Sequence, residues 1–313
     1  MPLTDSPRLA PPPPSPATTG KPAEPSSPGT LLRLALPKGR MQEGIFSLFA
    51  EAGIELRGGS RGYRPQVSLP GIDAKILKPQ NVVEMLHAGS RDVGFAGADW
   101  VRELDAGLVE VLDTGLDRVR LVAAAPAALV TDGRLPKRPL VIASEYERIT
   151  RSWIKARELT ATFVRSYGAT EVFPPEDADC IVDIAASGDT LRAQNLTVFD
   201  ELMTSSTRLY ANPAALENPE RRAAIDRLVL LLRSVLEARL RVMVEVNVSS
   251  QALSAVIAAL PCMREPTVSQ LHGGTGYAVK AAVPRATLPL LISEIKARGG
   301  TDIVVSQLSQ IIP

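Results

Sequence analysis

The strongest constraint on the fold is a repeated passage from a short apolar run, through a turn, into a helical pattern. In the first unit, an apolar strand at 31–36 leads through Pro37-Lys38-Gly39-Arg40 into a helical repeat that ends at Gly53. Further strand patterns follow at 118–126, 140–143 and 161–164, and further helical patterns at 79–89 and 147–159. This alternation predicts an α/β fold with a mainly parallel sheet. Such sheets bind ligands beyond the carboxyl ends of their strands, so the turns there are the first candidates for a site.

The turn after one apolar strand carries the residue types of a phosphate-binding loop. Residues 179–191 read Asp-Cys-Ile-Val-Asp-Ile-Ala-Ala-Ser-Gly-Asp-Thr-Leu, with Asp183 near the strand end. Small residues let backbone N–H groups converge on an anion, and a helix expected from about Leu191 points its positive end at the same place. The order resembles the phosphoribosyl-diphosphate (PRPP) loop of phosphoribosyltransferases. Taken alone, the run fits an ordinary strand-to-helix turn equally well.

Two other turns are candidates for ligand contact. Lys38 and Arg40 flank the start of a predicted helix, and Gly39 lets a ligand approach the backbone. The glycine-rich stretch 92–100 ends a strand beside Asp99. Each also has a simpler interpretation. Lys38 and Arg40 fit a role as solvated loop residues equally well, and for Asp99 the role of helix N-cap is slightly favoured.

Composition narrows the possible chemistry. Lys and Arg number 35 against 34 Asp and Glu, so no net field indicates nucleic acid or an anionic membrane as partner. The two cysteines, Cys180 and Cys262, are far apart, which fits a reducing compartment. The only histidines are His87 and His272, so the chain has few of the residues that a zinc site or a Ser-His-Asp triad needs. Carboxylates, cations and backbone amides must therefore do the chemistry.

The two ends of the chain differ from its middle. Residues 1–30 contain 10 of the 26 prolines and are expected to be a disordered tail. The segment lacks the pattern of a signal peptide, and the chain lacks an apolar run of the roughly 20 residues that span a bilayer. A cytoplasmic location is expected. At the other end, the pattern of residues 241–313 predicts a βαββαβ order, the ferredoxin-like arrangement. A domain of this kind acts either as a metabolite sensor that self-associates or as scaffolding.

In combination, these segments resemble the long form of ATP phosphoribosyltransferase, the first enzyme of histidine biosynthesis. The resemblance covers 31–313 in order and includes 36–40, 92–99, 168–174, 183–196 and the βαββαβ tail. It implies a two-lobed catalytic core like a periplasmic binding protein and a C-terminal ferredoxin-like (ACT-like) regulatory domain. The implied boundaries are 31–119 and 203–239 for lobe I, 120–202 for lobe II with the PRPP loop, and 240–313 for the regulatory domain.

The resemblance also implies roles for individual residues. N1 of ATP attacks C1 of the PRPP ribose and displaces diphosphate, so catalysis depends mostly on alignment and charge. Ser187, Gly188, Asp189, Thr190 and Leu191 form the loop for the 5-phosphate, where the Asp189 carboxylate must point away from the ligand. Asp183 and Glu171 face the ribose hydroxyls and Mg²⁺, the implied cofactor, which arrives with PRPP. Lys38 and Arg40 serve the negative groups of ATP or diphosphate, and Asp99 and Arg120 line the cleft.

The resemblance further implies feedback inhibition by histidine at the C-terminal domain. Thr267 matches a ligand-contacting position, and Asn247 stands where some relatives carry Asp. The implied partners are ATP, PRPP, histidine and further copies of the chain, as a dimer or hexamer. Two other functions stay open: a non-catalytic binding subunit on a periplasmic-binding scaffold, and a phosphoribosyltransferase for another base.

Overall fold

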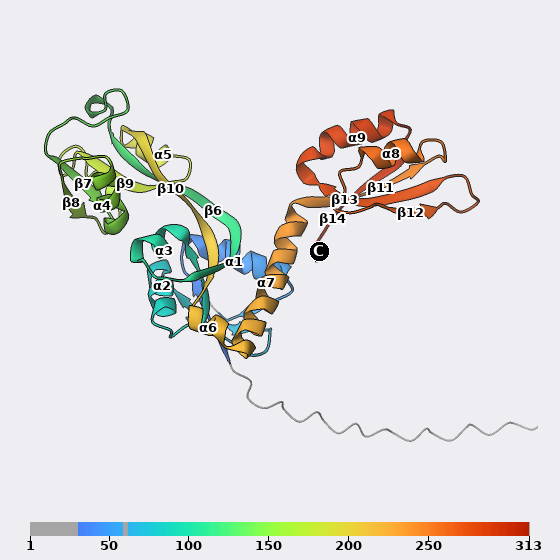
Figure 1. Cartoon of the computed structure of the whole chain (residues 1–313), viewed down its shortest axis with the longest axis horizontal. Coiled ribbons are helices and arrows are strands. Elements are labelled where there is room, and N and C mark those ends of the chain that lie inside the picture. Colours follow the sequence, from blue (N-terminus) through green and yellow to red (C-terminus); the bar gives the residue numbers. More distant parts are fainter. Residues whose placement is uncertain (1–30, 59–61, 313) are drawn as a thin grey trace, which may run out of the picture.

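A computed structural model describes residues 31–58 and 62–312; the tail expected at 1–30 lies outside that range. The fold is mixed α/β, with an eight-stranded sheet, a four-stranded sheet and a two-stranded ribbon (Figure 1). Among these residues, no helix has the length and apolar character needed to cross a membrane.

The elements up to the end of the large sheet are as follows. The strands are β1 (Leu32–Pro37), β2 (Leu56–Arg57), β3 (Gln66–Val67), β4 (Ile72–Leu77), β5 (Val93–Gly97), β6 (Val109–Pro126), β7 (Leu140–Ser144), β8 (Ala161–Arg165), β9 (Cys180–Ala185) and β10 (Leu196–Ala211). The helices are α1 (Arg40–Glu51), α2 (Pro79–His87), α3 (Ala98–Leu104), α4 (Glu147–Ala156) and α5 (Asp189–Ala193), with short 3-10 turns η1 (Ala127–Leu129) and η2 (Thr170–Val172).

The large sheet is parallel on both flanks and antiparallel in its centre. Its strand order is β4-β1-β5-β10-β6-β9-β7-β8. The pairs β4-β1, β1-β5, β9-β7 and β7-β8 are parallel, whereas β5-β10, β10-β6 and β6-β9 are antiparallel. The prediction of a mainly parallel sheet is therefore wrong for the centre. The reason is that the chain leaves one half of the sheet along β6 and returns along β10, which forces these two long strands to be antiparallel.

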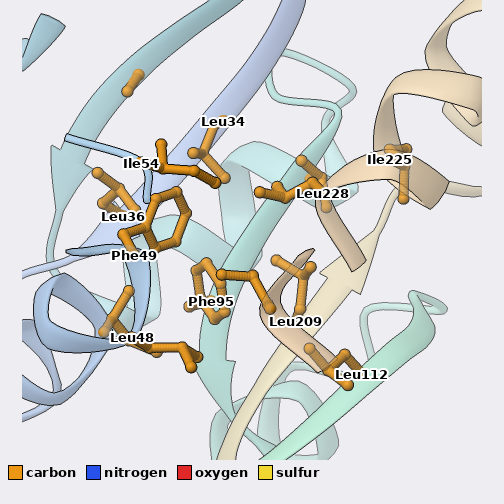
Figure 2. Close-up of a cluster of buried hydrophobic side chains, with 14 of the residues drawn as sticks. Leu34, Leu36, Leu48, Phe49, Ile54, Phe95, Leu112, Leu209, Ile225 and Leu228 are labelled. Atoms are coloured by element: carbon orange, nitrogen blue, oxygen red, sulfur yellow. The ribbon is translucent and has the colours of Figure 1, made fainter. Parts of the chain in front are cut away.

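The half-sheet β4-β1-β5 and its helices form what we call the first lobe. Helix α1 and a later helix, α7 (Pro219–Arg239), bury their apolar sides on one face, while α2 and α3 cover the other. Figure 2 shows the larger of these two cores, in which Phe49 and Phe95 meet edge to face with ring centroids 5.9 Å apart. Burial of the regularly spaced Ile45, Leu48 and Phe49 explains the helical pattern after Arg40.

The half-sheet β9-β7-β8 and its helices form the second lobe. Helix α4 packs on one face through Ile149 and Trp153, and α5 lies on the other through Leu191. Trp153 is a core residue, and its indole N–H donates to Asp200 at 2.7 Å.

The C-terminal part is a separate four-stranded sheet reached through α7 (Figure 1). Its elements, with the short helix that precedes α7, are α6 (Pro213–Glu217), β11 (Arg241–Val248), α8 (Leu253–Ala259), β12 (Thr267–Gln270), β13 (Tyr277–Pro284), η3 (Arg285–Thr287), α9 (Leu288–Ala297) and β14 (Thr301–Gln307). This confirms the predicted βαββαβ order. The strand order β12-β13-β11-β14 is antiparallel throughout, and α8 and α9 share its apolar core. Asn218 caps α7, because its side chain accepts from the Arg221 amide at 3.0 Å.

Candidate active site

The carboxyl ends of the two half-sheets point at each other along β6. At the end of β5, Gly97 pairs with Thr207, which in turn pairs with Leu116. At the end of β9, Ala185 pairs with Arg120. These positions are four residues apart on β6, a separation of at most roughly 13 Å for an extended strand, and the strand is bulged between them. The turns that follow β1, β5, β7 and β9 therefore surround one space between the lobes.

The turn after β1 presents its two cations to solvent. Lys38 and Arg40 are exposed, and Gly39 adopts φ 87°, a left-handed conformation that favours glycine, at the N-cap of α1. The Lys38 ammonium donates to the Tyr63 hydroxyl at 3.3 Å and lies 5.0 Å from the centre of its ring. Tyr63 comes from a stretch without a strand or helix pattern, so no local signal indicated its contact with Lys38.

Asp183 is a largely buried acid near the end of β9. Its Oδ1 accepts the backbone N–H of Ile184 at 2.7 Å. Burial, opposed by that hydrogen bond and assisted by the nearby carboxylates of Glu171 and Glu145, raises the pKa of Asp183 to about 6. Glu171 was anticipated here, but Glu145 was not. The signal that could have found Glu145 is its place directly after β7, a neighbour of β9 in the sheet.

The predicted phosphate loop leads directly into α5. Gly188 has φ 81° at the N-cap, and the helix begins at Asp189, two residues earlier than expected. Ser187 and Thr190 are exposed, whereas Leu191 is buried in the core beneath the loop. The loop therefore offers hydroxyls on its outer side and is anchored by an apolar residue on its inner side.

The side chain of Asp189 is held by two neighbours. Its carboxylate accepts from the Ser187 hydroxyl and forms an ion pair with Arg192, and these contacts lower its pKa. The Arg192 guanidinium also donates to the Ser187 carbonyl at 3.3 Å, close to Gly188. Arg192 was missed, although its spacing of three from an acid on a helix is a recognisable pairing pattern.

Arg120 lines a pocket of about 390 Å³ on the β6-β10 ribbon, together with Arg118, Arg208 and Ala186 of the phosphate loop. Arg120 pairs with Glu201 at 3.3 Å, and both side chains are over 40% exposed. The pair contributes little to stability, so the guanidinium can exchange partners easily.

Asp99 occupies a different environment from the one favoured on sequence. It is not the N-cap of α3, which is Gly97, but lies one residue inside the helix. Its side chain is buried, and both carboxylate oxygens have partners there. Oδ1 accepts from Ser205 Oγ and Oδ2 from the Tyr146 hydroxyl, each at 2.7 Å. Asp99 thus joins α3 to β10 and to the turn before α4, instead of presenting a free carboxylate to the space between the lobes.

Within the described ranges, no three His, Cys, Asp or Glu side chains are grouped closely enough to hold a metal by themselves. The carboxylates of Glu171 and Glu145 act electrostatically on Asp183, so these three acids form a negative cluster. Such a cluster suits a cation that arrives with other ligands of its own.

Asn247 and Thr267 lie on the uncovered face of the C-terminal sheet. Thr267 of β12 pairs with Lys280 of β13, which pairs with Glu245 of β11 two residues before Asn247. Val244 and Val246 alternate with these positions and are buried under the helices. The pairing register therefore places Asn247 and Thr267 on the same face of the sheet. The Asn247 side-chain amide also donates to Asp302 at 3.2 Å.

Comparisons with known proteins agree over nearly the whole described chain. A family model described as ATP phosphoribosyltransferase matches residues 78–234, and one described as HisG, C-terminal domain, matches 238–310. ATP phosphoribosyltransferases of Pelotomaculum thermopropionicum and Desulforudis audaxviator are 36% and 37% identical, covering 90% of this chain and 99% of each relative. An ATP phosphoribosyl transferase (HisG:HisZ) complex from Thermotoga maritima contains a chain with a TM-score of 0.59 and 25% identity, covering 66% of this chain and 99% of that one.

Proposed function

This chain belongs to the ATP phosphoribosyltransferase family, and we propose that ATP and PRPP meet where its two half-sheets face each other. The reaction transfers the phosphoribosyl group of PRPP to N1 of ATP, the first step of histidine biosynthesis. The observation that carries the proposed location is the pairing register, which brings the carboxyl ends of β5 and β9 within four residues of each other on β6.

PRPP is assigned to the second lobe. The amides and hydroxyls of 187–190 hold the 5-phosphate at the start of α5, and Leu191 anchors that loop in the core. Asp183 and Glu171 face the ribose hydroxyls. The carboxylates of Asp183, Glu171 and Glu145 would lie close to Mg²⁺ bound with PRPP, and the ion would supply positive charge that offsets the diphosphate.

ATP is assigned to the first lobe, beside the turn after β1. The adenine N1 lone pair forms the bond to ribose C1 as the bond from C1 to diphosphate breaks, with inversion at C1. Lys38, Arg40 and Arg120 offset the charge of the triphosphate and of the departing diphosphate. The chain supplies alignment and charge, which is sufficient because diphosphate leaves readily once neutralised.

The two-lobed core is proposed to be periplasmic-binding-protein-like, with lobe I at 31–119 and 203–239 and lobe II at 120–202. The regulatory part is proposed to span 240–313. The βαββαβ part is proposed as an ACT-like domain that binds histidine on the face bearing Asn247 and Thr267. Homo-oligomer formation through this part and a cytoplasmic location complete the proposal. The exposed Val304 and Val305 of β14 support the self-association.

The deciding experiment measures phosphoribosyl-ATP and diphosphate formation from ATP, PRPP and Mg²⁺. Gly188→Trp should abolish turnover, because the added ring fills the 5-phosphate position. Gly133→Trp, at an exposed turn of the second lobe, is the matched control. Ligand binding without turnover in the unmodified protein would favour a non-catalytic binding subunit, and turnover with another purine or pyrimidine would identify a different acceptor.

A further inference from the structure

Helix α4 has no N-cap of its own. It begins at Glu147, and the residue at its N-cap position, Tyr146, has no side-chain bond to the helix amides. The amides of the second and third helical residues therefore need an outside partner. They find one in Glu103, which lies 45 positions earlier on α3 of the first lobe. Its Oε1 accepts from Arg148 N at 2.9 Å and its Oε2 from Ile149 N at 3.0 Å.

The same two helices are joined by a second set of buried contacts. The Tyr146 hydroxyl donates to Asp99 of α3 at 2.7 Å, and its ring lies 4.8 Å from that of Trp100. Glu103, Asp99 and Tyr146 are 8%, 5% and 3% exposed, so these bonds are shielded from water. Exposed Asp105 and Arg148 add an ion pair at the margin. We call the contacts of Glu103, Asp99 and Trp100 with the start of α4 the α3–α4 junction.

The junction holds the turn that approaches the proposed ribose site. Glu145 immediately precedes Tyr146, and its charge acts on Asp183. Its Oε1 would lie 4.0 Å from a Cβ added at Gly168, so the carboxylate points toward the 168–171 turn. Fixing the start of α4 therefore fixes Glu145 beside Asp183, and it also sets how the first lobe lies against the second.

We propose that Glu103 and Tyr146 are positioning residues for the transfer reaction, which hold the ATP-bearing lobe and the PRPP-bearing lobe in reacting register. This inference rests on the proposed placement of the substrates. Because attack requires N1 and C1 to be aligned at close range, a small change in the relation between lobes lowers turnover steeply. Each substrate contacts mainly its own lobe, so its binding changes much less.

The test compares Glu103→Ala and Tyr146→Phe with Asp105→Asn, the control that removes the charge of the exposed pair beside the junction and keeps a residue type suited to the left-handed backbone there. Glu103→Ala should lower kcat at least 10-fold and change KM for ATP and PRPP by less than about 3-fold. Tyr146→Phe keeps the ring against Trp100 and should lower kcat about 3- to 10-fold. Asp105→Asn should match the unmodified protein. Glu103→Gln, which keeps one carbonyl acceptor, should recover part of the kcat lost in Glu103→Ala.

Hydrogen exchange provides a readout that does not depend on turnover. The amides of Arg148 and Ile149 should exchange faster in Glu103→Ala, while those of the distant β11 stay protected. Unchanged kcat in both Glu103→Ala and Tyr146→Phe would overturn the proposal, as would a rise in KM with kcat unchanged. If the unmodified protein makes no product, the proposed function fails, whereas the exchange data still decide whether Glu103 caps α4.

Discussion

A side chain that serves the reaction can lower the free energy of unfolding of the protein. Asp183 is the clearest case, because its pKa of about 6 means that the folded state favours the protonated acid more than the unfolded chain does. The stability linked to this group is fully present below its unfolded pKa of about 3.9. It is lost as the pH rises through about 6.

Asp183→Asn should therefore stabilise the free protein at pH 8 while removing activity. We expect the free energy of unfolding to rise by roughly 1–3 kcal/mol at pH 8, with the gain absent below about pH 4. Denaturant titrations at both pH values measure it, and Asp177→Asn, at an exposed site before β9, is the control. A loss of stability at pH 8 would contradict the buried-charge account.

The ion pair on the phosphate loop allows a double-mutant cycle. Arg192 and Ser187 hold the Asp189 carboxylate, so Arg192→Ala should free a negative charge beside the 5-phosphate and raise KM for PRPP several-fold. Asp189→Ala should leave KM unchanged or lower it, and the double variant should behave like Asp189→Ala. If Arg192→Ala is equally harmful in both backgrounds, Arg192 contacts the phosphate itself.

At the scale of elements, close packing of β5 depends on a glycine in the strand. A Cβ at Gly94 would lie 2.8 Å from the Ala35 Cβ and 2.9 Å from the Val82 Cγ1. Gly94→Ala should cost about 1–3 kcal/mol of unfolding free energy. The matched change Gly44→Ala in α1 meets only Leu116 at 3.5 Å and should gain up to about 1 kcal/mol. Thermal or denaturant unfolding of the two variants tests this; equal effects would contradict the packing argument.

Local patterns predicted the elements whose burial follows a simple period. Helices α1 and α2 and the C-terminal βαββαβ order were found in this way because periodicity is a local signal. Strand β4 was missed because Asp73 and Lys75 interrupt its apolar residues. The antiparallel centre was missed because no local pattern shows that β6 and β10 pair over almost their full length.

The candidate site was predictable to a similar degree. Asp183 and the 187–191 loop were found because strand, turn and helix follow one another in the chain. Glu103, Glu145 and Tyr146 were not, because their relevance depends on pairing and packing between segments that are 38 to 47 residues apart. Asp99 was noticed for its position after a strand, but its burial depends on partners from two other elements.

At the scale of the whole molecule, catalysis and regulation are expected to separate. If histidine binds the uncovered face of the C-terminal sheet, Thr267→Ala and Asn247→Ala should each weaken inhibition about 10-fold, the loss of one or two hydrogen bonds, and leave uninhibited turnover unchanged. Ser293→Ala, on an exposed side of α9 in the same domain, should have no effect. Inhibition curves for the three variants provide the measurement, and unchanged inhibition in the first two would exclude this face.

The long ladder between β6 and β10 also determines the order in which the molecule can be completed during synthesis. Strand β5 ends at Gly97, but its partner β10 begins only at Leu196, roughly 100 residues later. At about 5–20 residues per second, the ribosome needs on the order of 5–20 s to make that stretch. One edge of β5 stays without its partner meanwhile, whereas β7, α4, β8 and β9 emerge together. The second lobe is therefore complete once α5 has been made, whereas the first lobe, which begins earlier in the chain, still lacks α7 and its neighbouring strand β10 and is the later one to close.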